Sequence, residues 1–192
     1  MGQVNISRRG FLVSAGLLAA TALTGCGSNG GSDEYTVGVL QLTEHSALDA
    51  ANKGFCKAIK KSGLKVKIEQ KNAQNDQSAC QTIATKFVGD NVNLIFAIAT
   101  PAAQAAAQAT SDIPIVGTAI TDYAASKLVK SNKKPGTNVT GSSDLTPVAE
   151  QLDMLHKVLP DAKTVGLLYC SAEPNSVYQC DVIAGYLEDM GL

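Results

Sequence analysis

The chain has 192 residues, a net charge of −1, 45% hydrophobic residues and only 17% charged residues. This composition excludes a disordered chain, because disorder goes with low hydrophobicity and high net charge. The small net charge argues against a polybasic nucleic-acid-binding protein. The apolar residues are mainly Ala, Val, Ile and Leu, with no Trp, which suits helices packed on a buried parallel sheet.

Residues 1–25 are predicted to be an export signal. Arg8 and Arg9 precede an apolar run from Phe11 to Leu23. That run has the length of a signal-peptide core and is too short for a membrane-spanning helix. The two arginines are compatible with both the twin-arginine route and the general secretory route.

Cys26 follows a branched residue and two small ones, Leu23, Thr24 and Gly25. This pattern is typical of lipoprotein signal peptides, which are cut before a cysteine that carries the lipid. We therefore expect an extracytoplasmic chain anchored to the bacterial cell membrane through Cys26, with residues 26–34 as a flexible tether. Removal of residues 1–25 takes away two basic residues and no acidic one, which leaves a net charge of −3.

Four further cysteines stand at positions 56, 80, 170 and 180. An oxidising compartment permits disulfides, and four cysteines allow three pairings. Cys170 and Cys180 are the closest in sequence and form the candidate disulfide, whereas Cys56 lies on an apolar helix face where free thiols are common. No C-x-x-C motif or Cys/His cluster occurs, so the sequence implies neither a metal site nor a cofactor.

From residue 35 onward, strand-like and helix-like patterns alternate. We expect strands at 35–41, 64–70, 93–99, 114–120 and 164–169, with a brief extended piece at 138–141. Helices are expected at 46–62, 77–90, 100–110, 123–129, 146–159 and 175–190. Ser46 with Asp49 resembles a capping box, Asn75 or Asp76 is expected to cap the second helix, and Thr100 the third. This order predicts an α/β fold in three layers, a parallel sheet with helices on both faces.

Ligands of such sheets bind at the carboxyl ends of the strands. The loops to consider are therefore 41–45, 99–100, 120–122 and 171–176. Thr100 opens a helix at a strand end, where its hydroxyl and free backbone N–H groups suit a carboxylate. Asp122 could bind an ammonium group, with Glu44 and Glu173 as rivals, so the pair suits an amino acid. The alternative is that Thr100 and Asp122 merely cap their own helices.

Catalysis has less support in the sequence. Motifs of nucleophile elbows and P-loops are absent. The one G-x-G-x-x-G spacing, at residues 25–30, lies at the predicted signal cleavage site and tether, where no strand precedes it. His45 beside Glu44 is the one candidate catalytic pair, and it would make the chain an extracytoplasmic hydrolase or isomerase. No Ser or Cys has the surroundings of an activated nucleophile. We therefore predict that the chain is not an enzyme.

Several longer motifs resemble one family. They are Glu44–Ala51 (EHSALDAA), Ala97–Ala105 (AIATPAAQA), Lys134–Gly141 (KPGTNVTG), Leu159–Gly166 (LPDAKTVG) and Glu173–Ser176 (EPNS). From Tyr35 to its last residue, the chain resembles the substrate-binding lipoproteins of ABC transporters, of the group that includes tryptophan- and tyrosine-uptake proteins.

The resemblance implies two α/β lobes of the type I periplasmic-binding-protein fold, closing over a small ligand that is an amino acid, in particular an aromatic one. It implies a membrane permease and its ATPase as partners, and no nucleic acid. The ligand-binding residues that it implies are Gln41, Glu44, His45, Thr100, Asp122, Glu173, Asn175 and Ser176. Tyr123 departs from relatives that often have Pro there, and it could contact the ligand or simply pack.

The same resemblance divides the chain into a first lobe, 35–143, and an incomplete second lobe, 144–192. One helix–strand–helix unit offers too little sheet to bury its own core. The sequence therefore indicates a truncated chain whose last fifty or so residues pack poorly and whose ligand binding is weak. A sensor domain that binds the same ligand but reports to another partner is a further alternative.

Overall fold

The computed structural model describes residues 34–192. The predicted signal peptide 1–25, the lipid-attachment residue Cys26 and nearly all of the tether lie outside the described residues. The strands are β1 (Tyr35–Gln41), β2 (Val66–Asn72), β3 (Leu94–Ile98), β4 (Ile115–Ile120) and β5 (Val139–Ser143). The helices are α2 (Ser46–Lys61), α3 (Gln77–Gly89), α4 (Thr100–Ala109), α5 (Val148–Val158) and α6 (Pro174–Asp189).

All five strands run parallel in one sheet, in the order β2-β1-β3-β4-β5. The chain leaves β1 for β2 on one side and then crosses back to β3 on the other side of β1. The strand order therefore reverses between β1 and β3, and their carboxyl ends open a crevice where ligands of parallel sheets bind.

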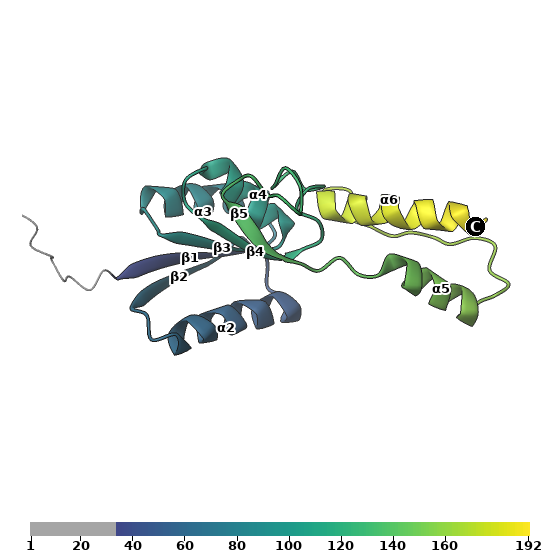
Figure 1. Cartoon of the computed structure of the whole chain (residues 1–192), viewed down its shortest axis with the longest axis horizontal. Helices are drawn as coiled ribbons and strands as arrows, with labels where there is room; N and C mark the ends of the chain where they lie inside the picture. The colour runs from purple at the N-terminus through teal and green to yellow at the C-terminus, as the bar shows by residue number, and fades with distance from the viewer. Residues whose placement is uncertain (1–33) are drawn as a thin grey trace, which may run out of the picture. The chain divides into compact units, whose positions relative to one another are not determined.

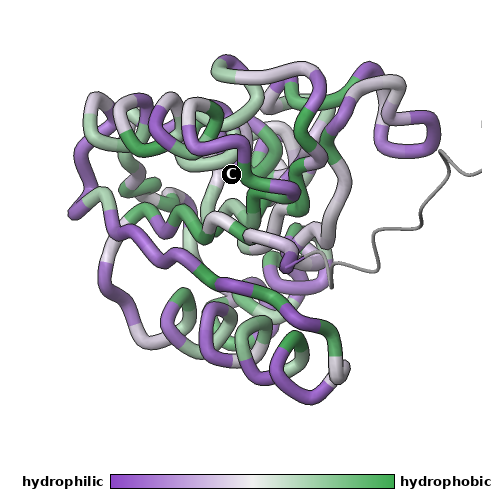
Figure 2. Tube along the Cα trace, turned by 90° about the vertical axis from the view of Figure 1, so that its left-hand side faces the viewer, coloured by the Kyte–Doolittle hydropathy of each residue, from purple (hydrophilic) through white to green (hydrophobic). Residues whose placement is uncertain are grey.

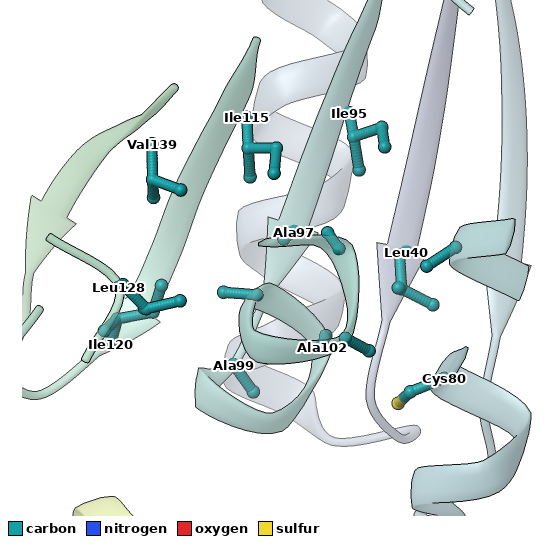
Figure 3. Packing of buried hydrophobic residues seen from close by; sticks show 14 of the residues in the cluster. Leu40, Cys80, Ile95, Ala97, Ala99, Ala102, Ile115, Ile120, Leu128 and Val139 are labelled. Atoms are coloured by element: carbon teal, nitrogen blue, oxygen red, sulfur yellow. The ribbon is translucent and has the colours of Figure 1, made fainter. Parts of the chain in front are cut away.

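The sheet is covered by helices on both faces, as predicted (Figure 1). Helices α3 and α4 pack on one face, where the larger core cluster includes Leu40, Phe87, Ile95 and Ile115. Figure 3 shows this cluster from close by, with side chains of the central strands meeting the small residues of α4. Helix α2 covers the other face, over a second cluster around Val39, Phe96 and Ile98, and Phe55 stacks on Phe96.

Small residues allow these layers to approach closely. Helix α4 buries Ala102, Ala103, Ala105 and Ala106, and alanine lets a helix lie close to the strands beneath it. A Cβ atom added to Gly38 of β1 would lie 2.6 Å from the Phe87 ring. The lack of a side chain at position 38 is therefore what admits the aromatic ring of α3 to the sheet.

Two predicted elements are absent from the described part of the chain. Residues 164–169 form no strand, and Leu168 is fully exposed there. The short apolar run of this segment predicted a strand, but within the described residues no neighbouring strand supplies hydrogen bonds to it. Residues 123–129 form successive turns instead of a helix, because the left-handed backbone of Lys127 (φ 58°) interrupts the helical path.

The helix caps differ in part from the prediction. Asp76 caps α3 as expected, accepting hydrogen bonds from the N–H groups of Ser78 at 2.7 Å and Ala79 at 3.0 Å. Helix α2 is capped by the His45 ring, whose Nδ1 accepts from Ala47 N, and not by Ser46. The predicted capping box is wrong because the Asp49 carboxylate accepts a hydrogen bond from Gln41.

Helices α5 and α6 pack on each other through a small cluster of their own. Its buried members are Val148, Leu152 and Leu187. No helix within residues 34–192 combines the length and the apolar character that a membrane crossing requires.

Candidate ligand-binding site

The carboxyl edge of the sheet brings together most of the predicted site residues. Gln41 ends β1, Thr100 follows β3, and Thr121 and Asp122 follow β4. Strands β1 and β3 flank the point at which the strand order reverses, so their loops lie at the crevice itself. The placement follows from the topology, because parallel strands present their carboxyl ends on one edge.

Thr100 is the most informative residue of this edge. Its side chain is 1% exposed, and its hydroxyl oxygen has no hydrogen-bond partner. The residue does not cap α4 as predicted: it is the first helical residue, and Ala99 occupies the cap without a side-chain bond. A buried hydroxyl without a partner costs about 1–3 kcal/mol, which points to a partner that arrives from outside the chain.

The backbone before Thr100 is strained. Ala99 has φ 88°, a conformation that costs a non-glycine residue about 1–3 kcal/mol and that collects at functional sites. Ala119 in the neighbouring β4 has φ 55°, beside a register irregularity between Gly117 and Ile120. Both outliers lie towards the carboxyl ends of adjacent strands, so the strain gathers where the candidate site lies.

The start of α6 reaches the same edge. The Gln179 side chain donates to the Thr121 hydroxyl at 2.9 Å, and the Gln77 side chain donates to Ala172 O at 3.3 Å. Asn175, between these two anchoring points, has a buried side-chain oxygen without a partner. Within residues 34–192, Thr100 and Asn175 are the two residues with such an orphaned side-chain atom, and both were predicted from the sequence to bind the ligand.

Gln41 is held by its own chain. Its amide nitrogen donates to Thr43 O at 2.8 Å and to the Asp49 carboxylate at 2.7 Å, and its oxygen accepts from Asn52 at 2.8 Å. The residue is 4% exposed. In this arrangement Gln41 ties the first two turns of α2 to the end of β1, and both of its N–H donors are used. Its predicted ligand contact stays a prediction.

Asp122 organises the loop after β4. One carboxylate oxygen accepts from Ala125 N at 2.8 Å and the other from Asn132 at 2.9 Å. A carboxylate has about four acceptor positions, so Asp122 keeps capacity for a further donor. No helix follows Asp122 for it to cap, so the residue holds its own loop instead and keeps room for a ligand contact.

Tyr123 packs. Its hydroxyl donates to Ser142 O at 3.1 Å, and burial, with a smaller contribution from Asp144, raises the pKa of Tyr123 to about 12. The ring lies against Gly117 and Gly141, where an added Cβ would clash with it. Of the two roles considered for Tyr123, the structure shows the packing one.

The remaining predicted residues occupy loop and cap positions. Glu44 and His45 are exposed, and His45 Nδ1 is engaged in the cap of α2. Glu173 is the N-cap residue of α6 and makes no side-chain cap bond. The Ser176 hydroxyl accepts from Cys170 N at 2.9 Å.

The candidate disulfide is not formed in this structure. Cys170 and Cys180 are both free thiols. Cys170 is exposed in the segment before α6, whereas Cys180 lies within that helix and is half-buried. Within the described residues no cluster of His, Cys, Asp or Glu could hold a metal ion.

Sequence reasoning missed three residues that hold the site in place. They each bind a residue of the carboxyl edge or its loops and are Asn52, Asn132 and Gln179. All three lie far from the strand ends in sequence. Thr121, which accepts from Gln179, lies in the loop 120–122 that the sequence did indicate. A groove of about 310 Å³ between α3 and α4 was also missed; it is lined by Gln77, Ser78, Gln81, Pro101, Gln104, Ala105 and Gln108.

The fold is that of an α/β lobe with a candidate ligand-binding site at the carboxyl edge of its sheet. The model of the family described as ABC transporter substrate binding protein matches residues 36–192. The chain belongs to this family.

Relatives support the assignment in sequence and in structure. A tyrosine-binding protein of Clostridioides difficile is 44% identical over 191 residues, which cover 91% of this chain and 55% of the relative. The crystal structure of an ABC domain from Streptococcus pneumonia in complex with L-Trp matches with a TM-score of 0.79 and 40% identity, over 83% of this chain and 55% of that one. A conserved domain protein of Vibrio cholerae matches with a TM-score of 0.79 and 38% identity, over the same shares. The chain thus spans about half the length of these relatives.

Proposed function

We propose that the chain is the extracytoplasmic solute-binding component of an ABC importer. It binds an amino acid at the carboxyl edge of its sheet and delivers it to a membrane permease driven by an ATPase. A lipid on Cys26 holds it at the membrane. The observation that carries the proposal is the pair of buried, unpartnered oxygen atoms of Thr100 and Asn175, which both belong to segments at this edge.

Thr100 is suited to the carboxylate of the ligand. The first N–H groups of a helix have no intrahelical partners and carry partial positive charge. At the start of α4, Pro101 removes one of these donors, and Ala103 N donates to Ala99 O at 3.1 Å. The donors that a carboxylate would meet are then the Thr100 hydroxyl and the backbone N–H groups of Thr100 and Ala102.

The ammonium group of the ligand requires acceptors. Asp122 keeps acceptor capacity beyond its two internal hydrogen bonds, and the Asn175 oxygen has no partner. Glu173 and Glu44 are further candidates at the edge. The tyrosine-binding relative and the relative in complex with L-Trp support an aromatic amino acid as the ligand.

The hydrolase or isomerase alternative finds no specific support. Its proposed base, His45, is exposed, and its Nδ1 serves as a helix cap. A catalytic base needs to lie within hydrogen-bond reach of a nucleophile or of the proton that it abstracts. We propose a binding protein and not an enzyme.

A ligand screen with the purified chain tests the proposal. Aromatic L-amino acids, offered up to millimolar concentration, are expected to raise the melting temperature in a saturable way, whereas their D-enantiomers are not. No shift with any amino acid, together with ester or sugar turnover that His45→Ala abolishes, would establish the enzyme alternative instead.

Thr100→Val sharpens the test, because valine keeps the shape and removes the hydroxyl. Hydrogen bonds to charged groups contribute about 1.5–3 kcal/mol, so affinity is expected to fall about 10-fold to 100-fold. The free energy of unfolding without ligand should not fall, since the hydroxyl has no partner to lose. Thr85→Val, the same change on the exposed face of α3, is the matched control. Equal affinities of both variants would rule out the role of Thr100.

A further inference from the structure

Positive charge is concentrated in one short stretch of this nearly neutral chain. Residues 53–71 contain seven of the 16 basic residues and a single acidic one, Glu69. The net charge of the whole chain is −1, so the remainder is clearly acidic. An average near zero therefore conceals a strongly basic region.

The structure gathers this charge on α2 and the adjacent strand β2. Lys53, Lys57, Lys60 and Lys61 are exposed on α2 and line a groove of about 440 Å³ together with Cys56 and Gln70. We call these four residues the lysine patch. Val66 and Ile68 of β2 face α2, so Lys65 and Lys71 lie on the other face of that strand, where Lys67 is paired with Glu69.

The stability of α2 does not account for the whole lysine patch. Like charges three or four residues apart on a helix repel and destabilise it by a few tenths of a kcal/mol per pair. Lys53 with Lys57, and Lys57 with both Lys60 and Lys61, have this spacing. The last turn of a helix does favour cations, but that accounts only for Lys60 and Lys61. An anionic partner would turn the repulsion into attraction.

The position of the patch indicates which partner it meets. Tyr35 N donates to Lys65 O at 3.0 Å, so the chain enters the fold beside the short connection that follows Lys61, the last lysine of the patch. In Figure 2, which faces the amino end of the sheet, α2 lies lowest and shows much hydrophilic colour. Cys26 precedes Glu34 by eight residues, and eight extended residues span at most about 29 Å.

We propose that the lysine patch docks the protein onto an anionic phospholipid bilayer, the one to which Cys26 would anchor it. The proposal uses the predicted lipid attachment at Cys26 but no property of the ligand site, so either can fail alone. Clusters of four to eight lysines beside a membrane attachment bind anionic headgroups, and the attraction falls off within a Debye length of about 8 Å. Docking through α2 would turn the opposite face of the sheet, which α3 and α4 cover, away from the bilayer.

Vesicle binding tests the proposal without the anchor. Residues 34–192 form one compact unit with a buried core, so this segment is used, free of the apolar leader and Cys26. We expect it to sediment with vesicles of phosphatidylcholine containing 30 mol % phosphatidylglycerol, and not with phosphatidylcholine alone. Half-molar salt should release it.

Two triple variants identify the contact surface. The first variant replaces three lysines of the patch: Lys57→Gln, Lys60→Gln and Lys61→Gln. It should bind the anionic vesicles about 100-fold more weakly, at about fivefold per lysine. The control variant replaces three exposed lysines elsewhere and changes the net charge equally: Lys127→Gln, Lys157→Gln and Lys163→Gln. Its binding should change less than about threefold. Thermal melts check that both variants fold. Absence of preference for the anionic vesicles, or equal losses in the two variants, would overturn the proposal.

Discussion

The sheet lobe, residues 34–143, and the α5–α6 segment, residues 144–192, are built very differently. The lobe has two core clusters, and Val39, Leu40 and Ile95 are fully buried there. The α5–α6 cluster has three buried members, none of them below 6% exposure. Eight of the ten large apolar residues exposed within the described part belong to α5–α6.

This difference in packing shows which residues of the candidate site are held rigidly. Thr100, Gln41 and Asp122 stand on elements of the well-packed lobe, and hydrogen bonds within the lobe hold Gln41 and Asp122 in place. Asn175 stands on α6, which the Gln179–Thr121 and Gln77–Ala172 hydrogen bonds join to the lobe. Segments with few buried contacts open at low free energy, so the two halves of the site should differ in rigidity.

The largest expected effect comes from the core of the lobe. Phe87→Ala removes a fully buried ring and should lower the free energy of unfolding by about 4 kcal/mol. Leu187→Ala in the α5–α6 cluster should leave the transition of the lobe nearly unchanged. Urea denaturation with segment-resolved hydrogen exchange distinguishes the two. A similar loss of protection in the lobe from both variants would show that the two regions unfold as one.

Two glycines should respond in opposite directions to the same change. A Cβ atom at Gly141, which has φ 158°, would overlap the carbonyl oxygen of Gly117 and the hydroxyl of Tyr123. Gly141→Ala should therefore cost about 3 kcal/mol. Gly185 of α6 has no atom within 4 Å of the added Cβ, so Gly185→Ala should stabilise its helix by up to about 1 kcal/mol. Thermal melts of both variants give the signs.

Tyr123 gives the lobe an alkaline limit. Its folded-state pKa, about 12, lies above the unfolded value of about 10. The stabilising contribution of the Tyr123 hydroxyl is thus fully present below pH 10 and is lost as the pH rises towards 12, by roughly 3 kcal/mol in all. The free energy of unfolding, measured from pH 9 to 12, should fall more steeply for the wild type than for Tyr123→Phe. Parallel curves would contradict this role of the buried hydroxyl.

The smallest effect compares two helix caps. The Asp76 carboxylate binds two N–H groups at the start of α3, and Asp76→Ala should cost about 1 kcal/mol. Glu173 occupies the same position in α6 without a side-chain bond, so Glu173→Ala should leave stability unchanged. A fall of equal size in both would mean that Glu173 caps α6 in solution.

The fold of the lobe was predictable because its signals are local. Apolar runs such as 93–99 mark buried strands, and Asp76 marks a helix start. The parallel arrangement followed from the alternation of strands and helices. Thr100, Gln41 and Asp122 were placed at one edge by the same topology.

The wrong predictions share one cause: each depends on whether a partner from elsewhere in the chain is present. Residues 164–169 have the pattern of a strand, but a strand needs a hydrogen-bonded neighbour, which no sequence pattern supplies. Asp49 has the spacing of a capping residue, yet Gln41 engages it from β1. The loop after β4 is held by Asn132, ten residues beyond Asp122. Side-chain partners at such separations leave no periodic trace in the sequence.

The parallel strand order has a kinetic consequence. None of the four strand pairs is a hairpin, and β1 pairs with β3 across 52 intervening residues. Loop closure between distant segments precedes the contacts that compensate for it, and domains rich in such pairings fold in milliseconds to seconds, not microseconds. Until β2 and β3 have followed it out of the ribosome, β1, the first of the described strands, has both of its edges unpaired.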